Sequence, residues 1–259
     1  MISCEVSWFC WPRTGVAVRT RARSCLASSM PEANAQYNIA RPDSLAVRVA
    51  ARVRAKMYRD FVRECGVSSE STILDVGVTS DQSYSSSNYL EALHPDKGKI
   101  TACGIDDASF LERLYPGVRF VFGNGLELPF DDRSFDFVHS SAVLEHVGSF
   151  ANQNRFVNEC ARVTRKGFFL TTPNRWFPIE FHTQLPLVHW LPKRQARKAL
   201  KAIGLEFFAE EANLNLVSRS ELRSIGRKLA GYRVRVLQRK LLGWPSNLML
   251  VGERLAKLG

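Results

Sequence analysis

An amphipathic helix is predicted near residue 50. Pro42 opens this stretch, Asp43 or Ser44 is suited to cap the helix, and Gly66 supplies a stop signal. Between them, apolar side chains recur at roughly every fourth position, at Leu45, Val49, Val53, Met57 and Val62.

Five short apolar runs follow, each with the composition of a buried strand: 71–77, 99–105, 118–122, 135–140 and 167–172. Helical patterns separate them, at about residues 85–93, 108–114 and 153–164. Strands that alternate with helices at this spacing form right-handed crossovers and a mainly parallel sheet with helices on both faces. The pattern therefore predicts an α/β fold, a Rossmann-like three-layer sandwich.

The alternation of predicted strands and helices ends after the fifth strand. Residues 173–192 are rich in proline and aromatic side chains, and a helix is predicted at 218–230. Two further strands are predicted at 232–238 and 247–252, joined by the turn signal Gly243-Trp244-Pro245. So short a connection requires an antiparallel pair. The complete prediction is a mostly parallel seven-stranded sheet with an antiparallel last strand.

The length of the chain, 259 residues with 45% hydrophobic content, suits one sizeable core. One domain is predicted over 30–259, with an insertion at 174–217. Residues 1–29 hold four arginines and one acid without a helical or strand period, and are predicted to be a disordered N-terminal extension upstream of a start at Met30. A transit peptide is the alternative, which Glu5, Trp8 and Trp11 make less suitable.

The formal net charge of +11 suits nucleic acid, an anionic membrane surface or an acidic ligand, and does not choose among them. Much of the excess lies in the first helix and in a basic helix at 193–201, where a solvated face explains it equally well. No apolar run approaches the roughly 18 residues of a membrane span, so we expect a soluble or at most peripheral protein.

The six cysteines form no CxxC pair and share no zinc-like spacing with the histidines, so no metal site is predicted. We interpret them as reduced thiols of a cytoplasmic protein. Cys103 and Cys160 lie in apolar runs and are expected to be small core residues.

Ligands of such sheets bind beyond the carboxyl ends of the strands. The segments that follow the five predicted strands are 75–81, 106–107, 123–125, 140–141 and 172–174. With the stretch GNGLELPFDDRSFDFVHSSAVLEHV at 123–147, they resemble class I S-adenosylmethionine-dependent methyltransferases, in particular the methyltransferase type 11 group that includes ubiquinone and menaquinone methyltransferases. The resemblance covers about residues 72–174, with a family-like tail to 251.

The resemblance implies S-adenosylmethionine as cofactor. It implies that Gly77 lets the backbone approach the methionine part of the cofactor, that Asp75 helps to hold this loop, and that Asp106 accepts hydrogen bonds from the ribose hydroxyls. The remaining implied contacts are with adenine, from Asn124, Gly125 and Leu126, and with the sulfonium and methionine portion, from Ser140 and Ser141.

Two departures from the family pattern stand out. Val78, Thr79 and Ser80 replace the usual glycines after Gly77, and Asn124 stands where an acidic residue is common. Taken singly, Asp75 and Asp106 could be helix or turn caps and Gly77 a plain turn glycine. Their positions at successive strand ends favour cofactor binding.

The methyl acceptor is predicted to lie beside the insertion 174–217. Its many aromatic and leucine side chains suit an apolar pocket or contact with a membrane. If the acceptor carries a proton, His146 in the VLEHV segment, expected to be helical, and His182 are the candidate catalytic bases. Either could instead be structural, and Glu145 carries the same ambiguity.

These observations predict methyl transfer to a small-molecule or lipid-like acceptor by direct in-line displacement. The fourth strand lacks the Asp/Asn-Pro-Pro-aromatic segment typical of amino methylation on nucleic acid bases, so a nucleic acid acceptor is less favoured. An RNA methyltransferase and a non-catalytic cofactor-binding protein stay open as alternatives. A dinucleotide-dependent oxidoreductase would need GxGxxG after the first strand, which is absent.

Overall fold

The computed structural model describes residues 44–84 and 86–256, all of which belong to one compact unit. The extension predicted at residues 1–29 lies outside the described residues and stays a prediction. Among the described residues, no helix is long and apolar enough to cross a membrane.

The first helix, α1 (Leu45–Cys65), confirms the amphipathic pattern. Ser44 caps its start, where the side-chain oxygen accepts a hydrogen bond from the Val47 N–H. Gly66 ends it in the left-handed conformation, with φ of 66°.

A seven-stranded sheet in the order β3-β2-β1-β4-β5-β7-β6 forms the middle layer. The pairs within β3, β2, β1, β4 and β5 are parallel, whereas β7 is antiparallel to both β5 and β6. The predicted fold class is therefore confirmed. The strands are β1 (Ile73–Val76), β2 (Ile100–Gly104), β3 (Arg119–Phe122), β4 (Phe135–Ser141), β5 (Thr164–Pro173), β6 (Tyr232–Leu241) and β7 (Trp244–Arg254).

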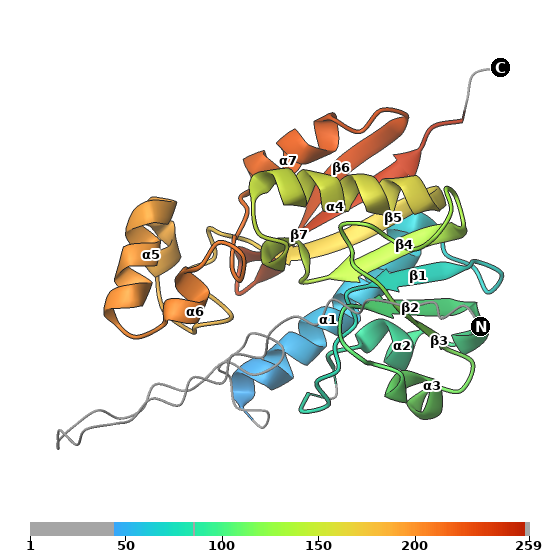
Figure 1. Cartoon of the computed structure of the whole chain (residues 1–259), viewed down its shortest axis with the longest axis horizontal. Coiled ribbons are helices and arrows are strands. Elements are labelled where there is room, and N and C mark those ends of the chain that lie inside the picture. The colour runs from blue at the N-terminus through green and yellow to red at the C-terminus, as the bar shows by residue number, and fades with distance from the viewer. Residues whose placement is uncertain (1–43, 85, 257–259) are drawn as a thin grey trace, which may run out of the picture. The chain divides into compact units, whose positions relative to one another are not determined.

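Helices cover both faces of the sheet (Figure 1). Alternating strand residues such as Ile73 and Phe137 pack with α1, α2 (Tyr89–Leu93) and α3 (Phe110–Leu114), whereas Leu74 and Val138 pack with α4 (Phe150–Val163) and α7 (Arg219–Arg227) on the other face. Cys103 and Cys160 are fully buried, as expected.

The turn between the last two strands differs from the prediction. Trp244 and Pro245 lie in β7, and the turn consists of Leu242 and Gly243, which have φ of 50° and 83°. Two successive left-handed residues make the tight turn that the twist of a hairpin favours. Pro245 is tolerated in the strand because it pairs with Lys240 beside a register shift.

Four helix predictions also need correction. The VLEHV segment is only one 3₁₀ turn, Leu144–His146. The helix expected at 153–164 is α4, which begins earlier than predicted, at Phe150, because Ser149 caps it. The helix expected at 85–93 covers only Tyr89–Leu93, and the one expected at 218–230 is Arg219–Arg227, with a capping box formed by Ser218 and Glu221.

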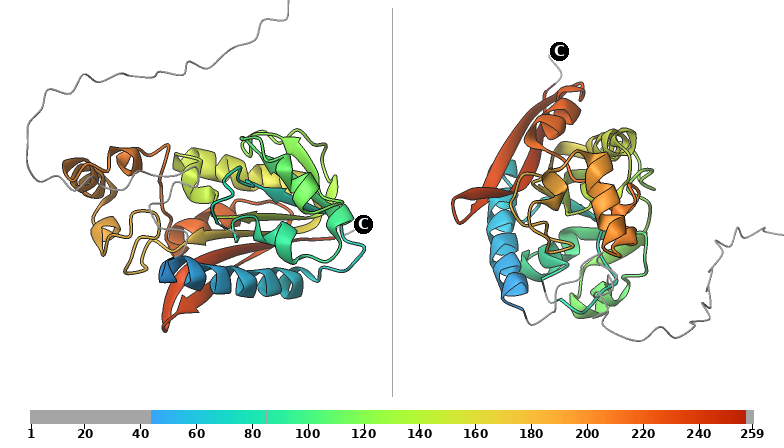
Figure 2. Two further views of the ribbon diagram at one scale, coloured as in Figure 1. Left: turned by 90° about the horizontal axis from the view of Figure 1, so that it is seen from below. Right: turned by 90° about the vertical axis from the view of Figure 1, so that its left-hand side faces the viewer.

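The insertion contains its own small structure beyond the end of β5 (Figure 2). It holds a 3₁₀ turn (Val188–Trp190) and the helices α5 (Lys193–Ala202) and α6 (Glu206–Ala209), and α5 is the basic helix that was predicted. A separate apolar cluster fills it, including Leu200, Phe208 and Leu214.

Candidate active site

The carboxyl ends of the parallel strands lie at one edge of the sheet and carry the predicted cofactor residues. Gly77 follows β1, Asp106 follows β2, and Ser141 ends β4. At the end of β5, the insertion approaches the same edge through Asn174, whose N–H donates to the Ser246 carbonyl at 2.9 Å.

Gly77 is exposed and has a φ of 93°, which only glycine adopts readily. Its N–H donates to the carbonyl of Cys103 at 2.7 Å, which ties the turn to β2. A Cβ at this position would lie 2.2 Å from Cγ2 of Val143. The turn therefore requires glycine on two grounds, and one of them is contact with this chain's own Val143.

Asp75 lies on the face of β1 that α1 and α2 cover, rather than at the open edge. Its carboxylate accepts a hydrogen bond from His139 Nδ1 at 2.7 Å, and the Tyr89 hydroxyl is 2.9 Å from His139 Nε2. Asp75 thus joins β1, β4 and α2 beneath the predicted site. Sequence analysis missed His139 because a single histidine in an apolar strand gives no signal of its partner.

Glu91 is fully buried near Asp75, and its carboxylate oxygens have no hydrogen-bond partner among the described residues. Burial, followed by the charge of Asp75, raises the pKa of Glu91 well above its ordinary value. Its buried position therefore favours the neutral acid over the carboxylate.

Asp106 fits the predicted contact with ribose. It is exposed, and its side chain makes no hydrogen bond or ion pair with another described residue. An ionised carboxylate only accepts hydrogen bonds, so it suits a pair of hydroxyl donors. The neighbouring Asp107 differs, because its Oδ1 already accepts a hydrogen bond from the Ser109 N–H at 2.9 Å.

The turn after β3 is built by its own residues. The Asn124 side-chain oxygen accepts a hydrogen bond from the Leu126 N–H at 2.9 Å. A Cβ on Gly125 would lie 2.6 Å from the ring of Phe156, so this glycine allows the turn to approach α4. Leu126 packs against the core on that side. Their contact with adenine stays a prediction.

The two serines at the end of β4 have partners within the protein. The Ser140 hydroxyl donates to the Val76 carbonyl at 2.7 Å, which joins β4 to the end of β1. Ser141 Oγ accepts a hydrogen bond from Thr171 Oγ1 at 3.0 Å. They hold the strand ends together, and their contact with the cofactor is untested.

His146 and His182 lie in direct contact, which the sequence did not indicate. Their Nε2 atoms are 3.1 Å apart, with the rings edge to face. His146 Nδ1–H donates to the Asn213 carbonyl at 2.6 Å. His182 Nδ1–H donates to Glu180 Oε1 at 2.6 Å, so Glu180 is a member of the site that was not singled out.

The charges in this cluster follow from burial and from the ion pair. Burial raises the pKa of Glu180, but the charge of His182 and its hydrogen bond outweigh burial and lower it to about 2. Burial by itself lowers the pKa of His182, because it disfavours the charged ring. The negative charge of Glu180 has the opposite effect and outweighs burial, so the pKa of His182 is raised. Burial, then His182, lowers the pKa of His146 to about 3. The two shifts favour a proton on His182 over one on His146.

Glu145 completes the cluster from the turn after β4. Its side chain is fully buried, Oε2 accepts a hydrogen bond from Thr172 Oγ1 at 2.9 Å, and Oε1 has no partner among the described residues. Burial raises the pKa of Glu145 to about 7.

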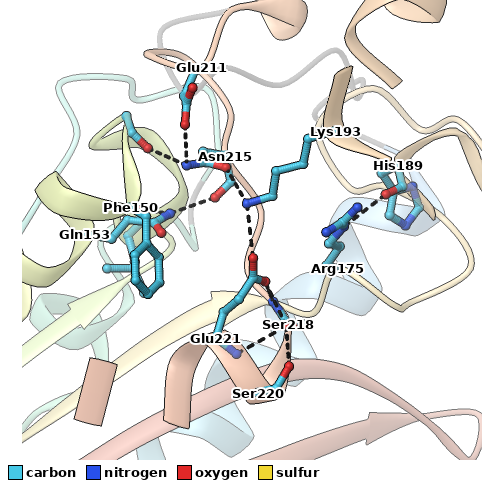
Figure 3. A network of polar contacts seen from close by, with 12 residues as sticks. Phe150, Gln153, Arg175, His189, Lys193, Glu211, Asn215, Ser218, Ser220 and Glu221 are labelled. Atoms are coloured by element: carbon cyan, nitrogen blue, oxygen red, sulfur yellow. Dashed lines mark hydrogen bonds and ion pairs between the residues drawn. The ribbon is translucent and has the colours of Figure 1, made fainter. Parts of the chain in front are cut away.

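Asn215 fastens the end of the insertion to this turn (Figure 3). Its N–H donates to the Glu145 carbonyl at 2.7 Å, and its side-chain amide donates to the Gly148 carbonyl at 2.6 Å. Lys193 donates to Asn215 Oδ1 at 2.9 Å and pairs with Glu221 of α7 at 3.3 Å. The cluster therefore lies in a firmly tethered part of the molecule.

The residues at this edge fit S-adenosylmethionine. Asp106, an exposed carboxylate without a partner among the described residues, follows β2, and an exposed glycine turn follows β1; these are features that would suit the ribose and the methionine part.

Comparisons with known proteins find a methyltransferase domain within the chain. Residues 75–171 match the family model described as a methyltransferase domain. No curated protein matches the chain. The matched domain and the fold indicate an S-adenosylmethionine-dependent methyltransferase, an enzyme whose methyl donor is S-adenosylmethionine.

Solved structures show the same fold at low sequence identity. A putative methyltransferase structure from Haloferax volcanii, solved in complex with the Trm112 methyltransferase activator, is 18% identical with a TM-score of 0.51, covering 85% of this chain and 98% of that one. A putative sarcosine dimethylglycine methyltransferase from Galdieria sulphuraria is 15% identical with a TM-score of 0.54, covering 80% and 87%. Magnesium protoporphyrin IX methyltransferase from Synechocystis, solved with bound S-adenosylhomocysteine, is 15% identical with a TM-score of 0.50, covering 81% and 85%.

Proposed function

We propose that this enzyme methylates an apolar small-molecule or lipid-like acceptor, held between the strand ends and the insertion 174–217. The observation that carries the proposal is the apolar surface of the insertion. Large hydrophobic side chains are exposed there, at Trp176, Ile179, Leu187, Leu191, Ile203 and Phe207. Exposed apolar side chains that gather in one segment mark a binding surface rather than ordinary scatter.

The surroundings of this surface suit an amphipathic acceptor and a peripheral contact with a membrane. The Trp190 ring stacks on Trp244 at 6.2 Å between centroids, and the Leu242 tip beside it is 99% exposed. The basic helix α5 belongs to the same insertion and supplies cationic side chains for an anionic headgroup. The three free cysteines in the described part of the chain support the proposed cytoplasmic location.

Direct in-line displacement is the proposed reaction. Bound S-adenosylmethionine supplies a methyl group that is already activated, so the chain has to hold the acceptor atom in line with the methyl–sulfur bond and exclude water. The acceptor electron pair forms the new bond to carbon, and the bonding pair of the methyl–sulfur bond leaves with sulfur. We propose that His146 and His182 contact the acceptor and are the groups that take its proton where it carries one.

The proposal is tested by incubating the enzyme with cell extract and methyl-labelled S-adenosylmethionine, then separating lipid, aqueous small-molecule and RNA fractions. Label in the lipid fraction, or in apolar small molecules, is the expected result. Label confined to RNA would replace this proposal with an RNA methyltransferase. The double variant Ile179→Ser/Leu191→Ser is expected to raise KM for the acceptor, whereas the control Leu93→Ser/Leu114→Ser changes equally exposed residues outside the insertion and leaves it unchanged.

A further inference from the structure

Two imidazole rings point their Nε2 atoms at each other in the cluster after β4. The Nδ1–H of His146 donates to the Asn213 carbonyl, and that of His182 donates to the Glu180 carboxylate, each at 2.6 Å. A neutral ring that carries its hydrogen on Nδ1 has a lone pair on Nε2. Two lone pairs 3.1 Å apart require a cation between them, either a proton or a metal ion.

A third ligand atom is directed at the same place. Glu145 Oε1 is buried and without a partner among the described residues, and it lies 4.0 Å from His146 Nε2. Glu145, His146 and His182 each offer one such atom, and the three atoms lie within 4.8 Å of one another. A buried carboxylate oxygen without a partner is costly, so its position calls for a ligand.

We propose that Glu145, His146 and His182 bind a divalent transition metal ion, with Zn²⁺ as the best-suited ion. Two imidazole nitrogens and one carboxylate are a common zinc ligand set that leaves a fourth position for water or for a heteroatom of another molecule. Tetrahedral zinc holds ligand atoms about 3.3 Å apart, given metal–nitrogen distances of about 2.0–2.1 Å. The two histidine nitrogens, 3.1 Å apart, nearly match this spacing, whereas Glu145 Oε1, 4.0 Å from His146 Nε2, has to move closer to bind the same ion.

The hydrogen-bond partners of the three proposed ligands are of the kind that metal sites require. Ligating histidines donate the other ring N–H to a carboxylate or a backbone carbonyl, as His182 does to Glu180 and His146 does to Asn213. The Glu145 carboxylate is oriented in turn by Thr172. The negative charges of Glu145 and Glu180 together offset the charge of a divalent ion.

The expected mechanical result is a bridge between two parts of the chain. Glu145 and His146 belong to the turn after β4, whereas His182 belongs to the insertion. A bound ion therefore ties the insertion to the sheet. With the ion bound, both Nε2 atoms are occupied, so this inference replaces the proton-accepting role proposed above for His146 and His182, and it holds whichever acceptor is methylated.

The test is metal binding by the full chain, prepared with a chelator and then titrated with Zn²⁺ in competition with a chromophoric chelator. We expect one tightly bound ion per chain and a rise in melting temperature. His146→Gln and His182→Gln should each weaken binding by more than about 100-fold, and Glu180→Gln by about 10- to 100-fold, the usual effect of removing a partner of a ligand. His189→Gln is the matched control, because His189 is a buried histidine of the same insertion whose Nε2 contacts the Phe177 carbonyl at 2.7 Å.

Titration with Co²⁺ distinguishes this site from the six cysteines. Nitrogen and oxygen ligands give visible bands without the intense near-ultraviolet band of thiolate coordination, and X-ray absorption of the wild-type zinc complex should show two imidazoles. These measurements on wild type also decide the matter if a variant fails to fold. Binding that is unchanged in the His146→Gln/His182→Gln double variant, a thiolate spectrum, or no stoichiometric ion in wild type would overturn the proposal and leave a shared proton between the rings.

Discussion

The Asp75 carboxylate of β1 accepts a hydrogen bond from His139 Nδ1 of β4, with the two atoms 2.7 Å apart. His139 is fully buried, and its other nitrogen lies 2.9 Å from the Tyr89 hydroxyl of α2. Because the carboxylate only accepts, Nδ1 carries the hydrogen, and in the neutral ring the hydroxyl donates to Nε2. One chain of hydrogen bonds thus fixes α2 and two strands directly beneath Gly77.

Tyr89→Phe should destabilise the enzyme through this chain. The substitution keeps the ring and leaves the buried His139 Nε2 without a donor, at a cost of about 1–3 kcal/mol in the free energy of unfolding. Urea unfolding measures it. Tyr58→Phe is the control, because the Tyr58 hydroxyl contacts His94 at a partly buried site and should cost only about 0.5–1.5 kcal/mol. An equal or smaller loss for Tyr89→Phe would show that the His139 nitrogen is satisfied in another way.

The raised pKa of Glu91 leads us to expect that the stability of the protein depends on pH. Its pKa in the folded protein is raised well above the ordinary 4.5, first by burial and then by Asp75. At a pH below the pKa of Glu91 in the unfolded chain, Glu91 is protonated in both the folded and the unfolded state, and its contribution to stability is fully present. As pH rises from there toward the folded pKa, only the unfolded state releases its proton, so stability is lost across this window.

Glu91→Gln should remove this loss, because the amide resembles the neutral acid and cannot ionise. We expect the variant to exceed wild type in unfolding free energy above neutral pH and to converge toward it near pH 4.5, the ordinary pKa. Urea unfolding across the pH range measures the difference. Glu70→Gln changes a carboxylate with an 84% exposed side chain and should leave the curve unaltered. Parallel curves for wild type and Glu91→Gln would mean that Glu91 does not titrate in this window.

The fold was predictable because it depends on periodicity along the chain. The four-residue spacing in α1 and the buried runs at β1 to β5 are local signals, and they determined the layers and the parallel sheet. The prediction was wrong where the residue types suggest one backbone conformation and the chain adopts another. Pro245 signals a turn by its type, yet it occupies a strand, because a register shift beside Lys240 leaves room for a residue without an N–H.

The site was predictable in outline only. Strand ends identify where ligands bind, so Gly77 and Asp106 could be named from the sequence. Contacts between residues far apart in the chain could not be predicted from the sequence. His146 and His182 are 36 positions apart, and Asp75 and His139 are 64 apart, so only the folded chain shows that each pair is in contact.

Asp106→Ala is expected to weaken binding of S-adenosylhomocysteine by about 1.5–3 kcal/mol, the range for a hydrogen bond to a charged group. Isothermal titration measures it. The adjacent Asp107→Ala is a stringent control, since Asp107 is also an exposed aspartate but bonds to the Ser109 N–H. The two variants remove the same charge from neighbouring positions. If they weaken binding equally, the effect is long-range electrostatic and Asp106 is not a ligand contact.

Gly77→Ala should damage both stability and cofactor binding, because the new Cβ meets a strained backbone and a neighbouring side chain at once. The φ of 93° disfavours any L side chain, and Val143 Cγ2 lies 2.2 Å from the added carbon. Gly66→Ala separates the two causes, because Gly66 has a φ of 66° with nothing within 4 Å of its Cβ position. It should cost only the left-handed backbone penalty, about 1–2 kcal/mol.

The Val143→Ala background tests the contact directly. Shortening Val143 removes the colliding methyl groups, so Gly77→Ala should cost less there than in wild type, although the backbone strain persists. Urea unfolding of the four proteins of this double-mutant cycle gives the coupling energy between the two positions. A Gly77→Ala cost that is the same in both backgrounds would show that the turn moves away from Val143, and that backbone conformation alone demands glycine at the end of β1.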